Sequence, residues 1–147
     1  MARQGGSSDY PWQQQEREDS TVEAMSVVFV YGTLKRGCSN HHWLAGAEYR
    51  GEAQLPGLAL HNLGPFPMAV ASSSATAPLC GELYAVSASQ LALLDQLEGV
   101  PRLYRREQRQ LASGAAVWVY LGSARQVKHA PLLEQGRWEA PQDGAPG

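Results

Sequence analysis

Glu98 lies among leucines near the end of a predicted helix, where a carboxylate could act as an acid or a base. On a helical wheel with about 100° per residue and Leu91 at 0°, the other leucines fall at about 200° (Leu93), 240° (Leu97) and 300° (Leu94). Glu98 falls at about 340°, within this arc of leucines. The carboxylate is therefore expected on the buried side, where burial and the negative helix end both raise its pKa. Such a group suits general acid–base catalysis at neutral pH. The alternatives are that the last turn tilts Glu98 into solvent or that it caps a backbone amide.

A second candidate is the loop GTLKRG, residues 32–37, which follows an apolar run. Its glycine spacing matches a P-loop, but Cys38 and Ser39 stand where the phosphate-binding lysine and the Ser or Thr are required. The sequence therefore excludes a nucleotide-hydrolysing P-loop. Backbone amides after a strand can still form a small anion-binding nest. The two cations of the loop, Lys35 and Arg36, are expected to be solvated.

Cys38, His41 and His42 form a third group with reactive side chains. The spacing C-x-x-H-H matches no strong zinc pattern, and nothing indicates that His61 or Cys80 supplies a further ligand. No metal site is predicted. A Cys38 nucleophile, in an amidase or acyltransferase, remains an alternative.

The elements that must position these residues are mostly strands. A helix is predicted over residues 89–98, with Ser87 and Gln90 forming a capping box and Gly99 as the stop. A shorter helix is expected over residues 41–47, capped by Ser39 or Asn40. Alternation and turn signals predict strands at residues 26–31, 48–55, 58–63, 68–71, 79–86, 103–111 and 115–122, the last two joined as a hairpin at Ser113-Gly114. The predicted class is α+β with a largely antiparallel or mixed sheet.

The length, composition, net charge and cysteine count limit the class of protein that this sequence can encode. The chain has 147 residues, is 44% hydrophobic and carries a net charge of -2, which fits one globular domain and argues against nucleic acid or an anionic membrane as partner. Residues 1–24 and 139–147 are predicted to be disordered tails around a domain at residues 25–138. Without a membrane-length apolar run or a signal-peptide pattern, and with only two cysteines, a cytoplasmic protein with reduced thiols is expected.

Two separated motifs together resemble the γ-glutamylcyclotransferase-like family. They are VYGTLKRG at residues 30–37, with Asn40-His41 close behind, and LDQLEGVPRLYRR at residues 94–106. GPFP and GELYAV fall between them in the expected order. The first motif is most similar to the γ-glutamylamine cyclotransferase branch. The resemblance covers residues 27–121 and leaves residues 125–138 without an interpretation.

The resemblance implies a small mixed β-barrel with flanking short helices and a cavity at one end. It implies that Glu98 is catalytic and that a substrate loop binds the ligand, with Tyr104 as a possible pocket residue; the loop residues are Tyr31, Gly32, Thr33 and Leu34. The implied reaction releases an amine or amino acid from a small γ-glutamyl substrate and forms 5-oxoproline, without metal or cofactor. A non-catalytic ligand-binding or interaction protein on the same fold is the other alternative. The oligomeric state is left open.

Overall fold

Residues 25–140 are described here in a computed structural model of the chain. Seven strands, one α-helix and one 3-10 turn are found in this range. Their bounds are β2 Ser26–Val30, η1 His41–Leu44, β3 Glu48–Leu55, β4 Leu58–Asn62, β5 Pro67–Ala71, β6 Leu79–Val86, α2 Ala88–Leu97, β7 Arg105–Gln110 and β8 Ala116–Leu121. The predicted tail at residues 1–24, and residues 141–147 of the tail predicted at 139–147, lie outside the described residues.

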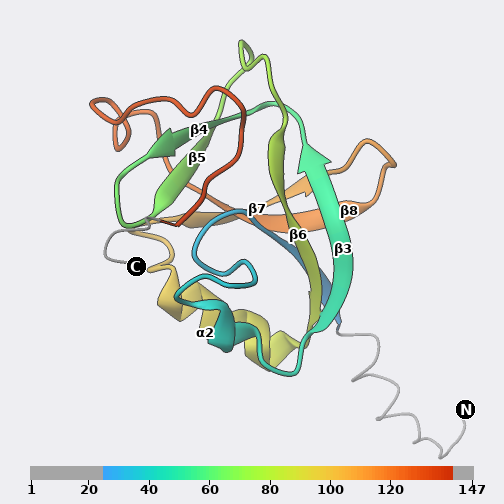
Figure 1. The fold of residues 1–147 in the computed structure, drawn as a ribbon. Coiled ribbons are helices and arrows are strands. Elements are labelled where there is room, and N and C mark those ends of the chain that lie inside the picture. The colour runs from blue at the N-terminus through green and yellow to red at the C-terminus, as the bar shows by residue number, and fades with distance from the viewer. Residues whose placement is uncertain (1–24, 141–147) are drawn as a thin grey trace, which may run out of the picture.

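Five strands form one sheet in the order β3-β6-β2-β8-β7, and β4 pairs with β5 in a separate hairpin (Figure 1). Strand β2 is central, as predicted; it runs antiparallel to β6 and parallel to β8. The α+β class and the mixed sheet are therefore confirmed. A closed barrel is not found within residues 25–140, because β3 and β7 are the two edges of the five-stranded sheet. The β4–β5 hairpin instead packs against one face of that sheet, where the Gly122 amide donates to Ala69 O at 2.9 Å.

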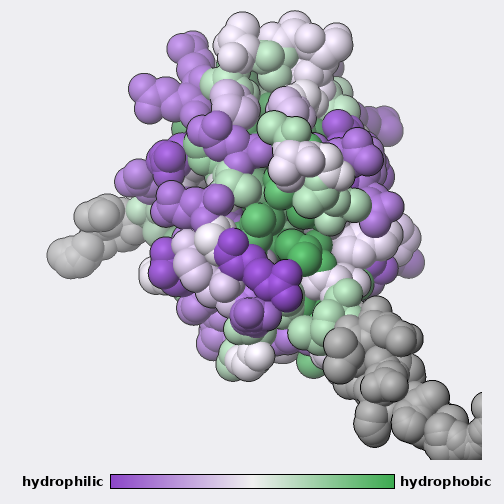
Figure 2. Space-filling model, turned by 90° about the vertical axis from the view of Figure 1, so that its right-hand side faces the viewer, coloured by the Kyte–Doolittle hydropathy of each residue, from purple (hydrophilic) through white to green (hydrophobic). Residues whose placement is uncertain are grey.

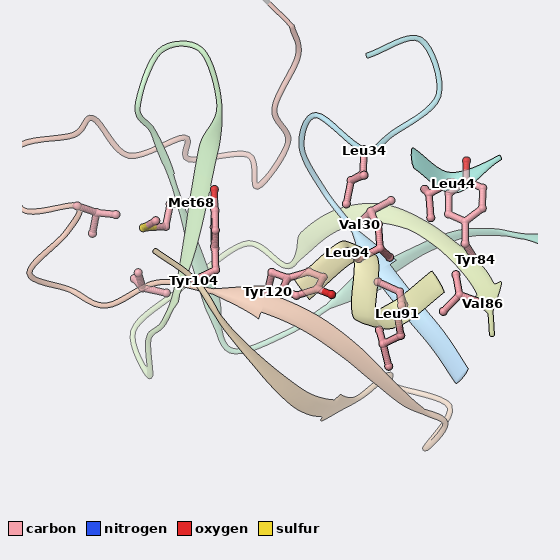
Figure 3. Packing of buried hydrophobic residues seen from close by; sticks show 13 residues of the cluster. Val30, Leu34, Leu44, Met68, Tyr84, Val86, Leu91, Leu94, Tyr104 and Tyr120 are labelled. Carbon is pink, nitrogen blue, oxygen red and sulfur yellow. The ribbon is translucent and has the colours of Figure 1, made fainter. Parts of the chain in front are cut away.

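The side chains of the sheet divide into two buried clusters because successive residues of a strand point to opposite faces. Val28 and Val30 of β2 join the helix-side cluster, which also holds Leu91 and Leu94 of α2. Phe29 joins the hairpin-side cluster on the other face. Figure 3 shows the helix-side cluster, in which Leu34 points toward Val30 and Leu94. The end of β2 is thereby fixed between two packed layers.

The molecular surface has polar and apolar regions. On the side shown in Figure 2, polar side chains cover most of the face and apolar ones gather in a small patch near its centre. No helix among residues 25–140 is long and apolar enough to cross a bilayer.

Helix α2 begins as the sequence predicts. The Ser87 hydroxyl accepts the Gln90 amide at 3.2 Å, which satisfies one of the free N–H groups of the first turn. The reciprocal half of the capping box is not formed. The Gln90 side chain donates instead to Ala45 O at 3.1 Å and so ties α2 to the segment after η1.

The other end of α2 is set by Gly99, whose φ of 68° is the left-handed conformation that stops a helix. Leu91 and Leu94 are buried, as the angular count predicts, but Leu93 is 49% exposed. The buried face of the helix is therefore narrower than the arc of leucines on the helical wheel, because Leu93, at about 200°, is left exposed to solvent. Glu98 falls beside the buried part of that arc.

The short helix predicted at residues 41–47 is only a 3-10 turn over His41–Leu44. Asn40 occupies its N-cap position, yet the Asn40 side chain makes no capping hydrogen bond. It donates to the Thr33 hydroxyl at 2.9 Å instead. This competing bond draws the residue toward the loop after β2, which is the loop that forms the site.

Candidate active site

A cavity opens where β2 ends and the loop of residues 31–34 begins. Its volume is about 30 Å³, room for about two water molecules or one carboxylate group. The lining includes the six residues that the family resemblance assigns to the site: Tyr31, Gly32, Thr33, Leu34, Glu98 and Tyr104. Residues about 65 positions apart in the chain are thus brought together at one end of the sheet.

The loop is closed by short-range hydrogen bonds. The Lys35 amide donates to Gly32 O at 3.0 Å, and the Asn40 amide donates to Thr33 O at 2.9 Å. The Asn40 side chain adds its bond to the Thr33 hydroxyl. Main-chain and side-chain bonds between Thr33 and Asn40 therefore hold the loop in one conformation.

Three consecutive main-chain amides of this loop, those of Gly32, Thr33 and Leu34, donate to no acceptor within residues 25–140. All three residues line the cavity. Unpaired successive amides form a concavity that binds anions or a developing oxyanion.

Gly32 is required by the closeness of β5. A Cβ atom at this position would lie 2.8 Å from both Cγ and Cδ of Pro67, a separation that real side chains do not adopt. Pro67 is itself held by Tyr104, whose hydroxyl donates to Pro67 O at 2.7 Å. A larger residue at Gly32 would displace the loop from the cavity wall.

Glu98 follows the last helical residue of α2 and faces the cavity from the opposite side. Within residues 25–140 its carboxylate forms no hydrogen bond and no ion pair. Burial raises the pKa of Glu98 to about 7. The shift arises from desolvation, which disfavours the charged form. At neutral pH the group is therefore divided between base and acid.

Three tyrosines surround this carboxylate. The Tyr31 hydroxyl donates to Tyr120 O at 2.6 Å and accepts from the Ala69 amide at 3.1 Å. Burial first, then the neighbouring Tyr104, raises the pKa of Tyr31 well above its usual value. Burial, followed by the charge of Glu98, likewise raises the pKa of Tyr104. These phenols stay protonated and neutral when Glu98 ionises.

Tyr120 and Phe66 also line the cavity, and the sequence did not identify them as site residues. The Tyr120 hydroxyl donates to Asp95 at 2.7 Å, and Asp95 lies 2.9 Å from Nε of Arg106. The latter contact is an ion pair without hydrogen-bond geometry, since Arg106 Nε has no hydrogen-bond partner. Phe66 belongs to the GPFP motif that the sequence analysis noted, but no local feature of the sequence predicts that Tyr120 lines the cavity.

The reactive side chains of residues 35–42 lie outside the cavity lining. The Cys38 thiol is half-buried, and burial raises its pKa, which lowers its thiolate fraction at neutral pH. His41 Nδ1 lies 2.9 Å from Leu34 O, and His42 is exposed. Among residues 25–140, no three His, Cys, Asp or Glu side chains are grouped so as to hold a metal ion.

Of the two loop cations, Lys35 is held by the C-terminal segment, whereas the Arg36 side chain is 53% exposed, as expected for a solvated charge. Lys35 Nζ donates to Trp138 O at 2.6 Å. The Arg36 guanidinium lies 4.1 Å from the ring centre of Tyr49, and its Nε is 3.8 Å from Glu82. Neither cation lines the cavity. Any anion bound there depends on the loop amides.

The C-terminal segment, which the sequence left without interpretation, is part of the folded unit. Trp138 is 3% exposed and packs in the hairpin-side cluster. The Leu133 amide donates to Leu60 O at 2.8 Å, and the Cys80 amide donates to Gly136 O at 2.8 Å. This segment therefore holds β4 and β6 together and contacts the loop after β2 through Lys35.

Comparisons with known proteins agree with this architecture. The model of the family described as "Gamma-glutamyl cyclotransferase, AIG2-like" matches residues 28–140, so it includes the C-terminal segment. The γ-glutamylcyclotransferase family protein YtfP of Escherichia coli K12 is 33% identical over 111 residues, which cover 76% of this chain and 94% of that protein. The γ-glutamylaminecyclotransferase of Bos taurus is 34% identical over 104 residues, covering 64% of this chain and 61% of that protein.

Solved structures extend the comparison to the fold. The crystal structure of an AIG2-like protein from mouse aligns with a TM-score of 0.62 at 26% identity, covering 81% of this chain and 97% of that one. The sequence match spans the loop and the helix end that line the cavity, and it includes the C-terminal segment. The chain therefore belongs to the γ-glutamyl cyclotransferase, AIG2-like family.

Proposed function

We propose that this protein is a cyclotransferase that cleaves a γ-glutamyl amine by attack of the substrate's own α-amine, forming 5-oxoproline. One observation carries the proposal: the partly buried carboxylate of Glu98 shares a small cavity with three main-chain amides, and neither it nor they have a hydrogen-bond partner within residues 25–140. A base and an oxyanion site are the two parts that such a reaction needs. The family to which the chain belongs and the name of its bovine relative support the same choice.

The first step is a proton transfer. Glu98 as carboxylate removes a proton from the α-ammonium group of the substrate. The freed amine then attacks the γ-carbonyl carbon, so that a C–N bond forms and a five-membered ring closes. The amides of Gly32, Thr33 and Leu34 stabilise the negative charge that develops on the carbonyl oxygen.

The second step releases the leaving group. Glu98, now protonated, donates its proton to the γ-amide nitrogen, and the original C–N bond breaks. The ring nitrogen, which still carries two protons after the attack, gives one of them to the departing amine and becomes the lactam N–H. The products are 5-oxoproline and a free amine, and no water is consumed. A pKa of about 7 allows Glu98 to serve as both base and acid near neutrality. Holding the flexible glutamyl chain curled supplies a further part of the rate.

Two other functions are less well supported by the geometry. A non-catalytic binding protein on this fold has no need of a desolvated carboxylate, which is unfavourable without partners. A Cys38 amidase requires a thiolate beside the substrate, whereas Cys38 does not line the cavity and its pKa is raised.

The test uses a γ-glutamyl amine and its N-acetyl form, with the acid product identified by mass. We expect 5-oxoproline from the first compound and no cleavage of the second, because acetylation removes the attacking amine. Release of glutamate would contradict the proposal, since glutamate is the product of water attack. Cleavage of both compounds at comparable rates would contradict it equally.

A further inference from the structure

Three phenols line the cavity with Glu98, yet within residues 25–140 none of them donates a hydrogen bond to its carboxylate. The hydroxyl of Tyr31 donates to a main-chain carbonyl at 2.6 Å, and that of Tyr104 donates to another at 2.7 Å. The hydroxyl of Tyr120 donates to Oδ1 of Asp95 at 2.7 Å. Each phenolic proton that could stabilise the Glu98 carboxylate is therefore directed to a different acceptor.

Asp95 differs from the other two acceptors because it is a side chain. The main-chain carbonyls are supplied by the folded backbone, whatever the side chains of those residues are. The hydrogen bond of Tyr120 depends instead on one carboxylate of α2, which lies about one turn before Glu98. Figure 3 shows the ring of Tyr120 pointing toward this helix. A single substitution at Asp95 would therefore release a donor inside the cavity.

We propose that Asp95 is a positioning residue: it holds the hydroxyl of Tyr120 away from Glu98, so that the Glu98 carboxylate stays free to take a proton from the substrate. The role of that proton transfer rests on the proposed function, whereas the effect of Asp95 on Glu98 does not. A phenol that donated to Glu98 would stabilise its charged form and make it a weaker base. Asp95 itself does not line the cavity.

The surroundings of Asp95 make it a strong acceptor. Its Oδ1 lies 2.9 Å from Nε of Arg106, so a guanidinium balances its negative charge. Arg106 lies opposite Tyr120 in the β7–β8 ladder, and its guanidinium carbon is 4.3 Å from the ring centre of Trp118. Hydrogen bonds to an ionised acceptor are shorter and stronger than those between neutral groups. Tyr120 therefore has a charged acceptor whose counter-ion is held by two paired strands.

The ionisable groups around Glu98 are few. Its carboxylate borders the inner cavity and a wider cleft of about 320 Å³, and within residues 25–140 the three tyrosines are the other titratable side chains that line these two spaces. The opposite charges of Asp95 and Arg106 lie beyond Tyr120. Burial first, then the hydrogen bond to Asp95, raises the pKa of Tyr120, so this phenol stays protonated and remains a donor. Loss of Asp95 would leave that donor without its acceptor.

The test follows the protonation of Glu98 directly, without substrate. Protein labelled with ¹³C at the glutamate carboxyl groups is titrated by NMR, and the Glu98 signal is the one missing from the Glu98→Gln protein. We expect a midpoint of about pH 7 in the wild type. In Asp95→Ala the midpoint should fall by about one pH unit, because the freed hydroxyl of Tyr120 donates to the carboxylate. An unchanged midpoint in folded Asp95→Ala would overturn the inference.

Two further variants separate the hydrogen bond from the loss of charge. Asp95→Asn removes the charge but keeps an oxygen that accepts from Tyr120, so it should recover at least about half of the shift. Combining Asp95→Ala with Tyr120→Phe should restore the wild-type midpoint, because no hydroxyl is left to donate. Equal shifts in the Asn and Ala proteins, or a shift that persists without the phenol, would assign the effect to unpaired Arg106 and overturn the inference.

Tyr120→Phe alone tests the same point without altering α2. The midpoint should stay near pH 7, because in the wild type this phenol donates to Asp95 rather than to Glu98. A midpoint about one pH unit higher would show that Tyr120 already donates to Glu98, which contradicts the inference even if Asp95→Ala does not fold.

Rates connect this arrangement to the reaction. The ascending limb of kcat/KM for 5-oxoproline release should move to lower pH in Asp95→Ala, and its plateau should fall about threefold because a weaker base is slower. If even the wild type forms no 5-oxoproline, the proposed function fails, while the NMR titration still decides whether Asp95 keeps Tyr120 from Glu98.

Discussion

The loop of residues 35–42 and the C-terminal end of α2 offer opposite combinations of reactivity and environment. The loop carries a cysteine, two histidines and two cations, which are the side-chain types most often associated with catalysis. The end of α2 carries one glutamate. Yet the loop's cations and His41 contact neighbouring residues, and none of the five lines the cavity. Glu98 is partly buried, lines the cavity and has no hydrogen-bond or ion-pair partner among residues 25–140.

The difference shows that environment, rather than side-chain type, prepares a group for chemistry. Cys38 becomes less reactive because burial raises its pKa away from neutrality. Glu98 becomes more useful because burial raises its pKa toward neutrality, to about 7. The same physical effect, desolvation of a charge, acts in opposite functional directions on the two residues.

The strongest test of this comparison is Glu98→Gln, which keeps the size of the side chain and removes the base. We expect the rate of 5-oxoproline formation to fall by about 100-fold or more, the range for lost general acid–base catalysis. Glu134→Gln, at an exposed carboxylate outside the cavity, is the control and should keep the wild-type rate. Wild-type turnover by the Glu98→Gln protein would remove Glu98 from the mechanism.

The same variant should be more stable than the wild type at alkaline pH. The folded-state pKa is raised from 4.5 to about 7, so the favourable contribution of the protonated group is complete below pH 4.5 and is lost as pH rises through 7. At pH 8 the wild type bears a desolvation penalty of up to about 3 kcal/mol that glutamine lacks. Urea unfolding at pH 8 and pH 4.5 measures it. A stability difference independent of pH would show that Glu98 is not desolvated.

The pH dependence of kcat/KM sharpens the comparison further. Because the carboxylate form of Glu98 is the base, activity should rise with pH through about 7. A single ionisation at that value predicts about a tenfold increase between pH 6 and pH 8. An ascending limb centred near pH 4.5 would mean that substrate-free Glu98 is fully solvated.

The smallest effects are expected on the loop side of the comparison. Cys38→Ala and His42→Ala should each keep activity within about twofold, because neither residue lines the cavity and the proposed nucleophile belongs to the substrate. Rates are measured beside melting curves, so that loss of fold is distinguished from loss of chemistry. Abolished activity in a folded Cys38→Ala protein would instead favour the amidase.

Features with local signals were predictable from the sequence. The cap at Ser87, the stop at Gly99 and the hairpin turn at Gly114 each depend on residues within a few positions, and each is found where it was expected. The place of Glu98 beside the leucine stripe followed from helix geometry alone. The resemblance between motifs then directed attention to the substrate loop.

Features set by distant contacts were not predictable. Tyr120 reaches the cavity because β8 pairs in parallel with β2, and the sequence of neither strand indicates which strand it pairs with. Asn40 was expected to cap a helix, but Thr33 competes for its side chain across the loop. The separate β4–β5 hairpin and the role of Trp138 depend in the same way on tertiary packing.

The bond from the Tyr31 hydroxyl to Tyr120 O has a consequence for the newly made chain. The two residues are 89 positions apart, so a ribosome adding about 5 to 20 residues per second needs roughly 4 to 18 seconds to pass from one to the other. During that interval the loop of residues 31–34 has been synthesised but one wall of its cavity has not. Translation that stops before β8 therefore yields a chain that contains both sequence motifs but cannot form the cavity, because Tyr120 is missing from its wall.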